Sequence, residues 1–425
     1  MEPNVPDHTE RGIIASPFQS WTNWSVATVY VVFCVFSVIS FAVLTNSIEE
    51  GTGLDNGVVS SIASVYFFMY AISQLIAGML IDRLGPRWLL GSTAIMATLG
   101  GFLFTASNTP AVLYLARGLM GVGLASSFVG ALYLARIWFP HDRFAFMSGL
   151  TQMIPNLFGA IGSVLIAGQD YVQVVFVSSI ANAVIALLIF MLVANRTGTP
   201  DEHPAPSMSQ VLRAMLEMGR SPQVWIASLY FAGTFGTFLA FADFWNIPFQ
   251  EAQGHDAGGQ ALMNAALPIG TAFGSVFIGW ASDRLRKIAQ PSRIMAILSV
   301  GIFGVLILLP NLPTSIDVVL LLLLGFTLGS AILAFPMASP HVEPRAQGTV
   351  IGLVTTVGYL AAGFVNAATN AIANTAPELG PFLSGEQSAE SITPGIMQEF
   401  QVAFIPMMGL MMLAVVMSFL ISDKK

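Results

Sequence analysis

Charged residues are scarce in this 425-residue sequence. Asp, Glu, Lys and Arg together make up 9% of the chain, whereas soluble domains carry about 25%. Hydrophobic residues make up 55% of it, and the mean hydropathy is +0.74. So little charge excludes an ordinary soluble domain. The composition indicates an integral membrane protein whose main partner is the lipid bilayer, and we expect no nucleic acid among its partners.

Groups that catalysis or metal binding would require are also few. Cys34 is the only cysteine, so the chain has no disulfide framework. No histidine lies in the middle of an apolar run; the positions are His8, His141, His203, His255 and His341. The phosphate-binding pattern G-x-x-x-x-G-K-[ST] is absent, which excludes direct use of ATP. We therefore expect no catalytic residue, no metal and no cofactor, and a protein that is not an enzyme.

The apolar residues are gathered in runs long enough to cross a membrane. A hydrocarbon core about 30 Å thick requires about 20 apolar residues of helix. Strands of a β-barrel would alternate polar and apolar residues, which runs such as VVFCVFSVISFAVL do not. The sequence therefore predicts an all-α membrane protein with twelve transmembrane helices, near residues 24–46, 57–81, 88–107, 110–135, 144–167, 171–194, 222–247, 259–281, 292–310, 316–339, 346–373 and 398–421.

Basic residues mark one side of the membrane. With both termini in the cytoplasm, fifteen of the sixteen Lys and Arg residues fall on cytoplasmic segments, and Arg117 is the exception inside a span. Outer segments carry acidic residues instead, such as Glu49 and Asp170. This distribution follows the positive-inside rule and predicts that both termini are cytoplasmic. We expect the location to be the bacterial inner membrane, and the N-terminal stretch to stay attached because it lacks the features of a signal peptide.

The chain contains an internal repeat. GMLIDR at 78–83 corresponds to GWASDR at 279–284, and WFPHDR at 138–143 corresponds to ASPHVEPR at 338–345. Two parallel six-helix halves with a substrate site between them are a recurrent design among transporters. The repeat predicts two six-helix repeats and the following division: an N-terminal tail (1–23), an N-terminal bundle (24–194), a cytoplasmic linker (195–221), a C-terminal bundle (222–421) and a C-terminal tail (422–425).

The linker itself predicts a short amphipathic helix. Ser207 and Gln210 can form a capping box, and apolar residues recur at helical spacing from Met208 to Leu216. Such a helix would lie on the cytoplasmic membrane surface. It would act there either as a brace between the halves or as part of a solvated turn.

Two motifs resemble those of a known family. G-x-x-x-D-R-x-G-x-R at 78–87 resembles the signature of the major facilitator superfamily, and YLARGLMGVGLA at 114–125 resembles that family's fourth-span pattern. With twelve runs in two halves, the resemblance covers nearly the whole chain and implies a major facilitator fold. It also implies a gating latch formed by Gly78, Asp82, Arg83 and Arg87, with Asp283 and Arg284 as a second copy. A carboxylate there can bind the N-terminus of a helix from the other half; the alternative is that these charges only anchor the chain at the surface.

Polar side chains within the runs are candidates for the lining of a cavity, because they are costly in contact with lipid. Several recur at helical spacing on one face of a run, for example Tyr66, Tyr70 and Gln74. The alternative role is hydrogen bonding between helices. The full set of substrate-binding candidates of this kind is Tyr66, Tyr70, Gln74, Gln152, Asn156, Asn264, Tyr359 and Asn366.

Two charged residues lie within or near the spans. Arg117 must meet an anion, a carbonyl dipole or water, so it is a candidate to bind a substrate carboxylate; the alternative is hydrogen bonding to neighbouring helices. Asp243, in LAFADFWNIPF, is the candidate for proton coupling. Its alternative is an acid of the outer interface beside the aromatic belt.

Absent motifs narrow the class of substrate. The fifth run lacks the G-P-x-x-G-G pattern typical of the family's drug/proton antiporters. The runs of the C-terminal half contain no Lys or Arg apart from Arg293 at the cytoplasmic end of one run, which disfavours a multiply charged anion. We expect a monomeric secondary active or facilitative transporter that moves a zwitterion, monocarboxylate or neutral metabolite by alternating access, with protons as the candidate coupling ion. The alternatives are an exporter of amphiphilic or siderophore-like compounds and a membrane sensor that does not transport.

Overall fold

The computed structural model describes residues 17–166, 168–195, 208–309, 312–384 and 394–422, and every regular element in these ranges is a helix. Long apolar runs form helices because a helix satisfies its own backbone hydrogen bonds within the bilayer. The first six spans and the short helices between them are α1 (Pro17–Val43), α2 (Thr45–Thr52), α3 (Asn56–Leu84), α4 (Pro86–Thr105), α5 (Pro110–Trp138), η1 (His141–Arg143), α6 (Phe144–Ile166) and α7 (Tyr171–Leu192).

The C-terminal half contains more interrupted helices. Two π-helical segments interrupt its first span, and one bend of 43° interrupts its last. Its elements are α9 (Pro222–Phe231), η2 (Ala232–Gly236), α10 (Thr237–Ala240), η3 (Phe241–Trp245), α11 (Asn246–Ala252), α12 (Ala257–Leu285), α13 (Ala289–Leu308), α14 (Thr314–Leu328), η4 (Gly329–Leu333), α15 (Ala334–Ala338), η5 (Ser339–His341), η6 (Pro344–Ala346), α16 (Gln347–Thr375), α17 (Leu379–Leu383), α18 (Pro394–Ala403) and α19 (Ile405–Leu420).

These helices account for all twelve predicted spans. Within the described residues, ten helices are long and apolar enough to cross a membrane by themselves, and the bent pair Gly395–Ala403 and Ile405–Leu420 adds an eleventh. The twelfth is α6, whose 23 residues coincide with the predicted run at 144–167. The chain is therefore an integral, multi-pass membrane protein, as its composition predicts.

The start of the first span differs from the prediction. Its helix begins at Pro17, inside the expected tail 1–23, while residues 1–16 lie outside the described part of the chain. The polar residues of this first turn have partners that the sequence pattern does not reveal. The Gln19 amide donates to the Leu192 carbonyl at 3.1 Å, and Asn23 accepts from the Ala194 amide at 2.9 Å. These hydrogen bonds fasten the start of α1 to the end of α7.

The helix predicted in the linker is present as α8 (Met208–Met218). Ser207 and residues 196–206 lie outside the described residues, so the capping box is not part of the structure described here. Arg213 and Glu217 are exposed, as the amphipathic pattern predicts, whereas Leu216 of the predicted apolar face is also exposed and the buried side chain is that of Met218. Helix α8 contacts both α3 and α16, one from each half of the chain. These contacts favour the brace over the solvated turn.

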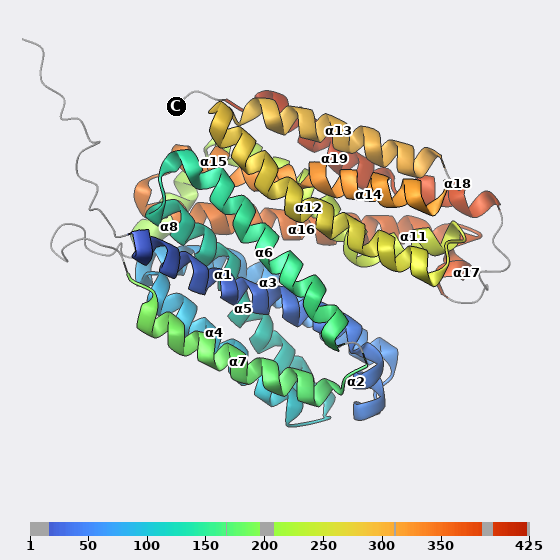
Figure 1. Ribbon diagram of the computed structural model, residues 1–425, viewed down its shortest axis with the longest axis horizontal. Coiled ribbons are helices and arrows are strands. Elements are labelled where there is room, and N and C mark those ends of the chain that lie inside the picture. Colours follow the sequence, from blue (N-terminus) through green and yellow to red (C-terminus); the bar gives the residue numbers. More distant parts are fainter. Residues whose placement is uncertain (1–16, 167, 196–207, 310–311, 385–393, 423–425) are drawn as a thin grey trace, which may run out of the picture.

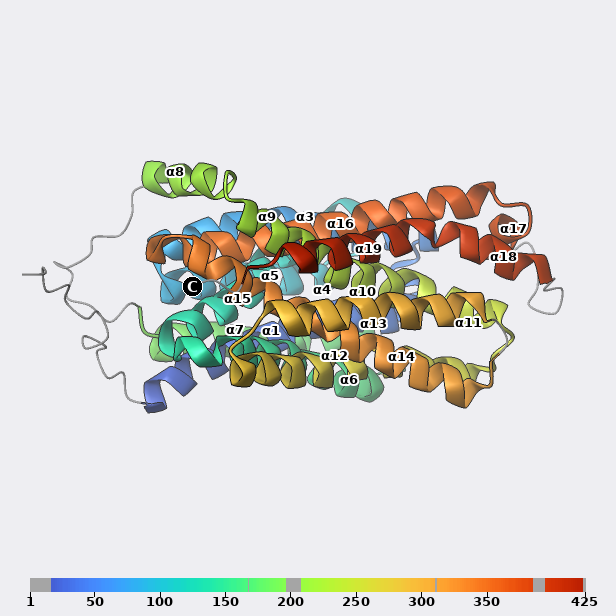
Figure 2. The same cartoon turned by 90° about the horizontal axis from the view of Figure 1, so that it is seen from above.

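The two ends of the bundle differ in charge and in packing. Helix α1 begins and α19 ends at one end, where α8 also lies (Figures 1 and 2). We call it the basic end, because the helix termini there carry Arg83, Arg87, Arg136, Arg143 and Arg284. At the opposite end lie α2, α17 and α18, and there the ribbons of the two halves diverge (Figure 1).

Glycines allow the halves to approach closely near the basic end. A β-carbon added to Gly78 of α3 would lie 2.4 Å from the Gly348 carbonyl oxygen of α16, and one added to Gly279 of α12 would lie 2.4 Å from the Ala145 carbonyl oxygen of α6. Any larger residue would force these backbones apart. Two helix pairs, α3 with α16 and α6 with α12, therefore form the tight contacts between the halves.

Candidate functional site

A central cavity of about 500 Å³ lies between the two halves. Side chains from α1, α3, α5, α6 and α12, from the interrupted helix Pro222–Ala252 and from α16 line it. Its size and mostly apolar lining are those of a site for a small organic molecule. The candidates from the sequence that line it are Tyr66, Tyr70, Gln152, Asn156, Asp243, Asn264 and Tyr359.

Aromatic rings cross the cavity from one half to the other. The rings of Tyr66 and Tyr70 stack at 5.8 Å, Tyr70 meets Tyr359 edge to face at 5.1 Å, and Tyr359 meets Phe235 in the same way at 5.3 Å. Such rings bind flat, apolar bodies over a large contact area and keep a polar tip for hydrogen bonding. The cavity is therefore suited to a solute with an apolar or aromatic body.

Polar side chains line the cavity from α6, α12 and the interrupted helix Pro222–Ala252. Gln152 and Asn156 flank Pro155 in α6, and Asn264 of α12 accepts a hydrogen bond from the Asn246 amide at 3.3 Å. Asp243 lies in the π-helical segment η3, and its side chain is exposed in the cavity. Segments of this kind are frequent at functional sites. Among the described residues that line the cavity, Asp243 is the one acid, and none is Lys, Arg or His.

Two candidates from the sequence hydrogen-bond other helices and do not line the cavity. Gln74 is buried and accepts a hydrogen bond from the Thr355 hydroxyl of α16 at 3.2 Å. Asn366 accepts one from the indole N–H of Trp245 at 2.8 Å. Both are hydrogen bonds between helices, which is the alternative role for these polar residues.

Arg117 also lies outside the central cavity. Its guanidinium is buried within the N-terminal half, over the faces of the Phe41 and Tyr66 rings, and donates to the Ser37 hydroxyl at 3.3 Å. The Tyr66 ring lines the cavity and separates it from the guanidinium. This position supports the alternative of contacts with neighbouring helices, and within the described residues Arg117 forms no ion pair with Asp243.

The carboxylate of Asp82 binds the first turn of α16. It accepts the backbone N–H of Gly348 at 2.9 Å, the N–H of Thr349 at 2.7 Å and the hydroxyl of Thr349 at 2.7 Å. The N-terminus of a helix carries unpaired donors and a partial positive charge, so an anion is stabilised there. Asp82 thus joins the two halves at the basic end.

Asp283 makes the corresponding contact in the second copy of the motif. Its carboxylate accepts the backbone N–H of Phe146 at 2.8 Å, in the first turn of α6. The arginines of the motifs are placed differently: Arg83 and Arg284 are exposed, and the Arg87 side chain donates to the Val193 carbonyl at the end of α7 at 2.6 Å. The two aspartates therefore make the contacts between halves, while Arg87 holds two helices of one half together.

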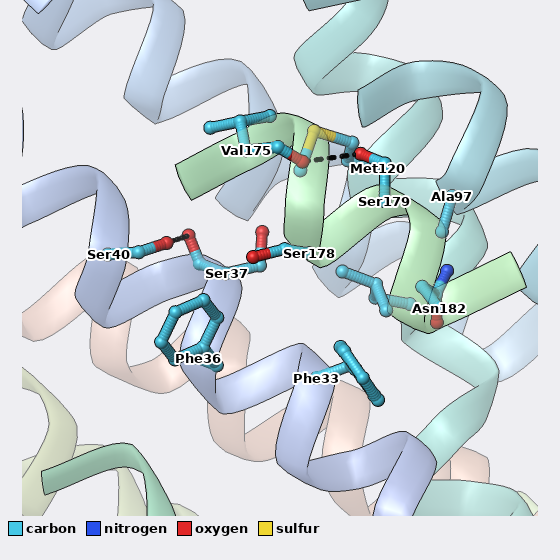
Figure 3. A pocket seen from close by; sticks show the side chains of 11 residues that line it. Phe33, Phe36, Ser37, Ser40, Ala97, Met120, Val175, Ser178, Ser179 and Asn182 are labelled. Atoms are coloured by element: carbon cyan, nitrogen blue, oxygen red, sulfur yellow. Dashed lines mark hydrogen bonds between the residues drawn. The ribbon is translucent and has the colours of Figure 1, made fainter. Parts of the chain in front are cut away.

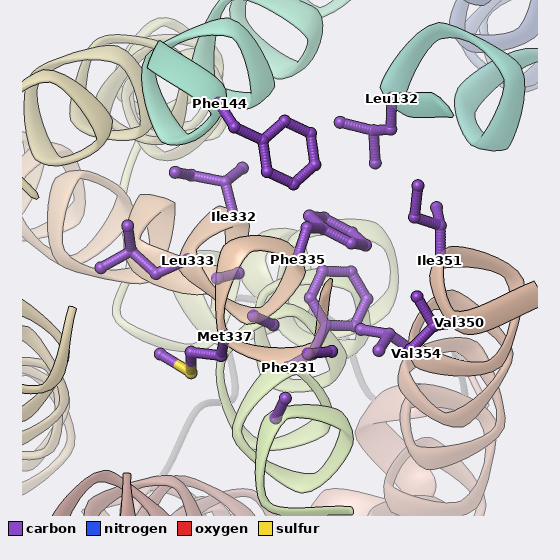
Figure 4. Packing of buried hydrophobic residues seen from close by; sticks show 14 of the residues in the cluster. Leu132, Phe144, Phe231, Ile332, Leu333, Phe335, Met337, Val350, Ile351 and Val354 are labelled. Atoms are coloured by element: carbon purple, nitrogen blue, oxygen red, sulfur yellow. The ribbon is translucent and has the colours of Figure 1, made fainter. Parts of the chain in front are cut away.

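Apolar side chains of both halves pack together near these contacts (Figure 4). Their cluster joins α5, α6, α9, α15 and α16, and Phe231 belongs both to this cluster and to the lining of the cavity. The rings of Phe231 and Phe335 lie 5.2 Å apart. Residues drawn in the cluster include Leu132, Phe144, Ile332, Ile351 and Val354. The structure is thus closed at the basic end.

The phenylalanines and aliphatic residues of the cavity were not predicted from the sequence. Phe231, Phe235 and Phe238 line it at helical spacing along one face of Pro222–Ala252, and Phe128 lines it from α5. The helical spacing of these phenylalanines was the one sequence feature that could have indicated them. It could not separate these rings from others that face lipid, because both environments are apolar.

Comparison with known proteins identifies the family. Residues 26–365 match the model of the Major Facilitator Superfamily. The chain is 22% identical over 345 residues to the “Gentisate transporter” of Corynebacterium glutamicum, with 78% of this chain and 77% of the relative covered. It is 24% identical over 355 residues to the “Probable sulfoacetate transporter SauU” of Cupriavidus necator, with 77% and 81% covered.

A solved structure has the same fold. The crystal structure of the transporter FucP in the outward conformation superposes with a TM-score of 0.72 and covers 96% of this chain and 100% of FucP. The sequences are only 13% identical, so this likeness concerns the fold alone.

Proposed function

Because this chain belongs to the Major Facilitator Superfamily, we propose that it carries a small organic monoanion across the membrane by alternating access, together with a proton that binds Asp243. The supporting observation is the central cavity between the halves, in which Asp243 is the acid and in which no basic side chain is among the described lining residues. The family assignment supports transport; the substrate and the proton are the proposal.

Because the basic end is closed, the central cavity can open only toward the opposite end of the bundle. In line with the positive-inside rule, we propose that the basic end faces the cytoplasm. The contacts of Asp82 and Asp283 and the apolar cluster then separate the cavity from the cytoplasm. In this proposal the structure represents the outward-facing state, and transport requires these contacts to break while the opposite end closes.

The negative charge of Asp243 favours binding of the anion together with a proton. Two negative charges 5 Å apart repel by about 3 kcal/mol at an effective dielectric constant of about 20. A monoanion therefore binds better when Asp243 is protonated, and the protonated carboxyl can then donate a hydrogen bond to the anion. The amides of Gln152, Asn156 and Asn264 supply further donors. A neutral solute would gain no relief of charge repulsion from that protonation.

The lining and the relatives support an aromatic or otherwise compact anion. The rings of Tyr66, Tyr70 and Tyr359 offer stacking surfaces for a flat body. The two relatives above are described by name as carriers of gentisate, whose single carboxylate makes it a monoanion at neutral pH, and of sulfoacetate, a compact anion with a sulfonate and a carboxylate. We propose a solute of this class, with one negative charge when carried.

The test is uptake by purified protein in proteoliposomes. A labelled hydroxybenzoate and a hydroxybenzenesulfonate are offered outside, with the outside more acidic than the lumen. The sulfonate stays ionised and does not cross the lipid unaided. We expect accumulation above the outside concentration, which collapses when the pH gradient is removed. A neutral sugar and a zwitterionic amino acid serve as competitors.

Variants separate transport from its coupling to protons. Asp243→Asn mimics the protonated side chain permanently, so it should still exchange labelled for unlabelled solute but lose accumulation driven by the pH gradient. Glu251→Gln, an exposed acid of the same span, should behave as wild type. Accumulation that Asp243→Asn leaves intact would refute the coupling role. Uptake of the labelled sugar or amino acid, without uptake of either anion, would refute the substrate class.

A further inference from the structure

The guanidinium of Arg117 lies in a chamber of its own inside the N-terminal half. The Arg117 residue is only 2% exposed, and its guanidinium carbon lies 4.3 Å from the centre of the Phe41 ring and 4.4 Å from that of Tyr66. Ring faces attract a cation. They do not replace acceptors for its N–H groups, which a guanidinium presents around its edge.

The hydrogen bonds and the charge of Arg117 are incompletely satisfied. One terminal nitrogen donates to the Ser37 hydroxyl at 3.3 Å, while Nε has no acceptor among the described residues. No carboxylate in the described part of the chain pairs with it. The side chain stays protonated at neutral pH, and an isolated charge at this depth costs about 3 kcal/mol or more. A small anion beside Nε would satisfy both the donor and the charge.

The space beside Arg117 is of the size of a single small ion. The chamber has a volume of about 20 Å³, and Ser37, Ser40 and Met120 line it together with Arg117. It adjoins a second space of about 40 Å³ between α1, α5 and α7, which shares Ser37, Ser40 and Met120 (Figure 3). One water requires about 10–15 Å³. The chamber therefore fits a halide-sized ion and excludes an organic substrate.

Different residues of α1 line the chamber and the central cavity. Cys34 and Val38 line the central cavity, whereas Ser37 and Phe41 line the chamber. The Tyr66 ring stands between the two spaces, since it lines the cavity and contacts the guanidinium. The two sites therefore share no lining residue and would bind their ligands separately.

We propose that Arg117 and Ser37 bind a small monovalent inorganic anion, of halide size, in this chamber. The Ser37 hydroxyl accepts a hydrogen bond from Arg117, which leaves its own O–H to donate to the anion. The Arg117 Nε–H supplies a second donor and the positive charge. The bound ion stabilises the packing of α1, α3 and α5 around the guanidinium and keeps the Tyr66 ring in place at the wall of the cavity.

The test is the thermal stability of the purified full-length protein in detergent. Sodium chloride or bromide replaces sodium gluconate at constant ionic strength, and unfolding is followed by tryptophan fluorescence. A ligand that binds only the folded state raises the apparent melting temperature in a saturable way. We expect such a rise with chloride and bromide. The same melting temperature in gluconate and in chloride would overturn the proposal, because water alone would then satisfy Arg117.

Variants assign the effect to the chamber. Arg117→Gln should abolish the halide-dependent rise, and Ser37→Ala, which keeps the cation, should shift half-saturation to severalfold higher halide concentrations. Arg143→Gln, an exposed arginine at the basic end, should respond as wild type. A rise with unchanged half-saturation in Ser37→Ala would overturn the proposal even if Arg117→Gln fails to fold. So would a rise that depends on Arg117 with acetate or benzoate but not with halides, since the site would then bind carboxylates.

Discussion

Replacing Asp82 by asparagine is expected to shift the protein away from the conformation described above. The carboxylate accepts hydrogen bonds from Gly348 and Thr349 of the other half, at 2.9, 2.7 and 2.7 Å. These bonds exist only while the basic end is closed. A substitution that weakens them lowers the stability of the closed state and leaves the state that is open at the basic end unaffected.

The size of the shift follows from the number and the charge of these bonds. A hydrogen bond to a charged group contributes about 1.5–3 kcal/mol, and an anion at a helix N-terminus contributes about 0.3–1 kcal/mol more. Asparagine keeps one acceptor oxygen but loses the charge, so we expect a net loss of about 1.5–3 kcal/mol. Because about 1.4 kcal/mol is a factor of ten, the ratio of closed to open states at the basic end should fall about 10- to 150-fold.

The assay is a distance measurement between two spin labels at the opposite end of the bundle. Exposed positions Ala106, after α4, and Glu251, in α11, carry the labels in a Cys34→Ser background, which removes the single native thiol. In the wild type the distances between the two labels should be those of halves that diverge at this end, as in Figure 1. In Asp82→Asn a population with shorter distances should appear, as that end closes.

Two further variants test the physical reason. Asp283 accepts the backbone N–H of Phe146 at 2.8 Å, whereas Asp82 accepts two backbone N–H groups and the Thr349 hydroxyl, so Asp283→Asn should shift the distances in the same direction but less. Asp142→Asn replaces an exposed acid at the same end and should shift nothing. Unchanged distances in Asp82→Asn, or equal shifts in all three variants, would refute the role of Asp82 as a latch.

Two more predictions concern packing. Gly78→Ala should abolish transport without abolishing expression, because the new β-carbon would lie 2.4 Å from the Gly348 carbonyl oxygen; Gly363→Ala, where nothing lies within 4 Å, is the matched control, and normal uptake by Gly78→Ala would contradict the argument. Trp245→Phe should lower the free energy of unfolding by about 1 kcal/mol, since it removes the hydrogen bond of 2.8 Å to Asn366; an unchanged melting temperature in detergent would contradict this.

The fold could be predicted because the bilayer imposes simple rules on a sequence. The length and apolar content of the runs define the spans. Because the arginines lie on one side of the membrane, the number of spans must be even. The start of α1 could not be predicted in this way. Gln19 and Asn23 look like residues of a polar tail, but they are helical because the end of α7 supplies partners for them. Such partners come from another part of the chain and leave no periodic signal.

The lining of the cavity could be predicted only in part, because one helical face meets different neighbours along its length. Tyr66, Tyr70 and Gln74 share a face of α3, yet only the two tyrosines line the cavity. At Gln74 the helix already packs against α16: a β-carbon on Gly352 would lie 2.6 Å from the Gln74 carbonyl oxygen. Spacing predicts the face, whereas the depth at which the halves meet decides which residues stay accessible.

This change of neighbours along α3 also connects the cavity to the latch. Asp82 follows Tyr70 by twelve residues, which is about 18 Å of helix. One continuous helix, Asn56–Leu84, carries both residues, and α16 likewise carries Tyr359 and the donors that Asp82 binds. A tilt of α3 against α16 that breaks the contacts of Asp82 must therefore also change the distance between Tyr70 and Tyr359, now 5.1 Å between ring centres. A solute that touches both rings binds the two states with different affinity, and such a difference is required for any ligand to shift the equilibrium between them.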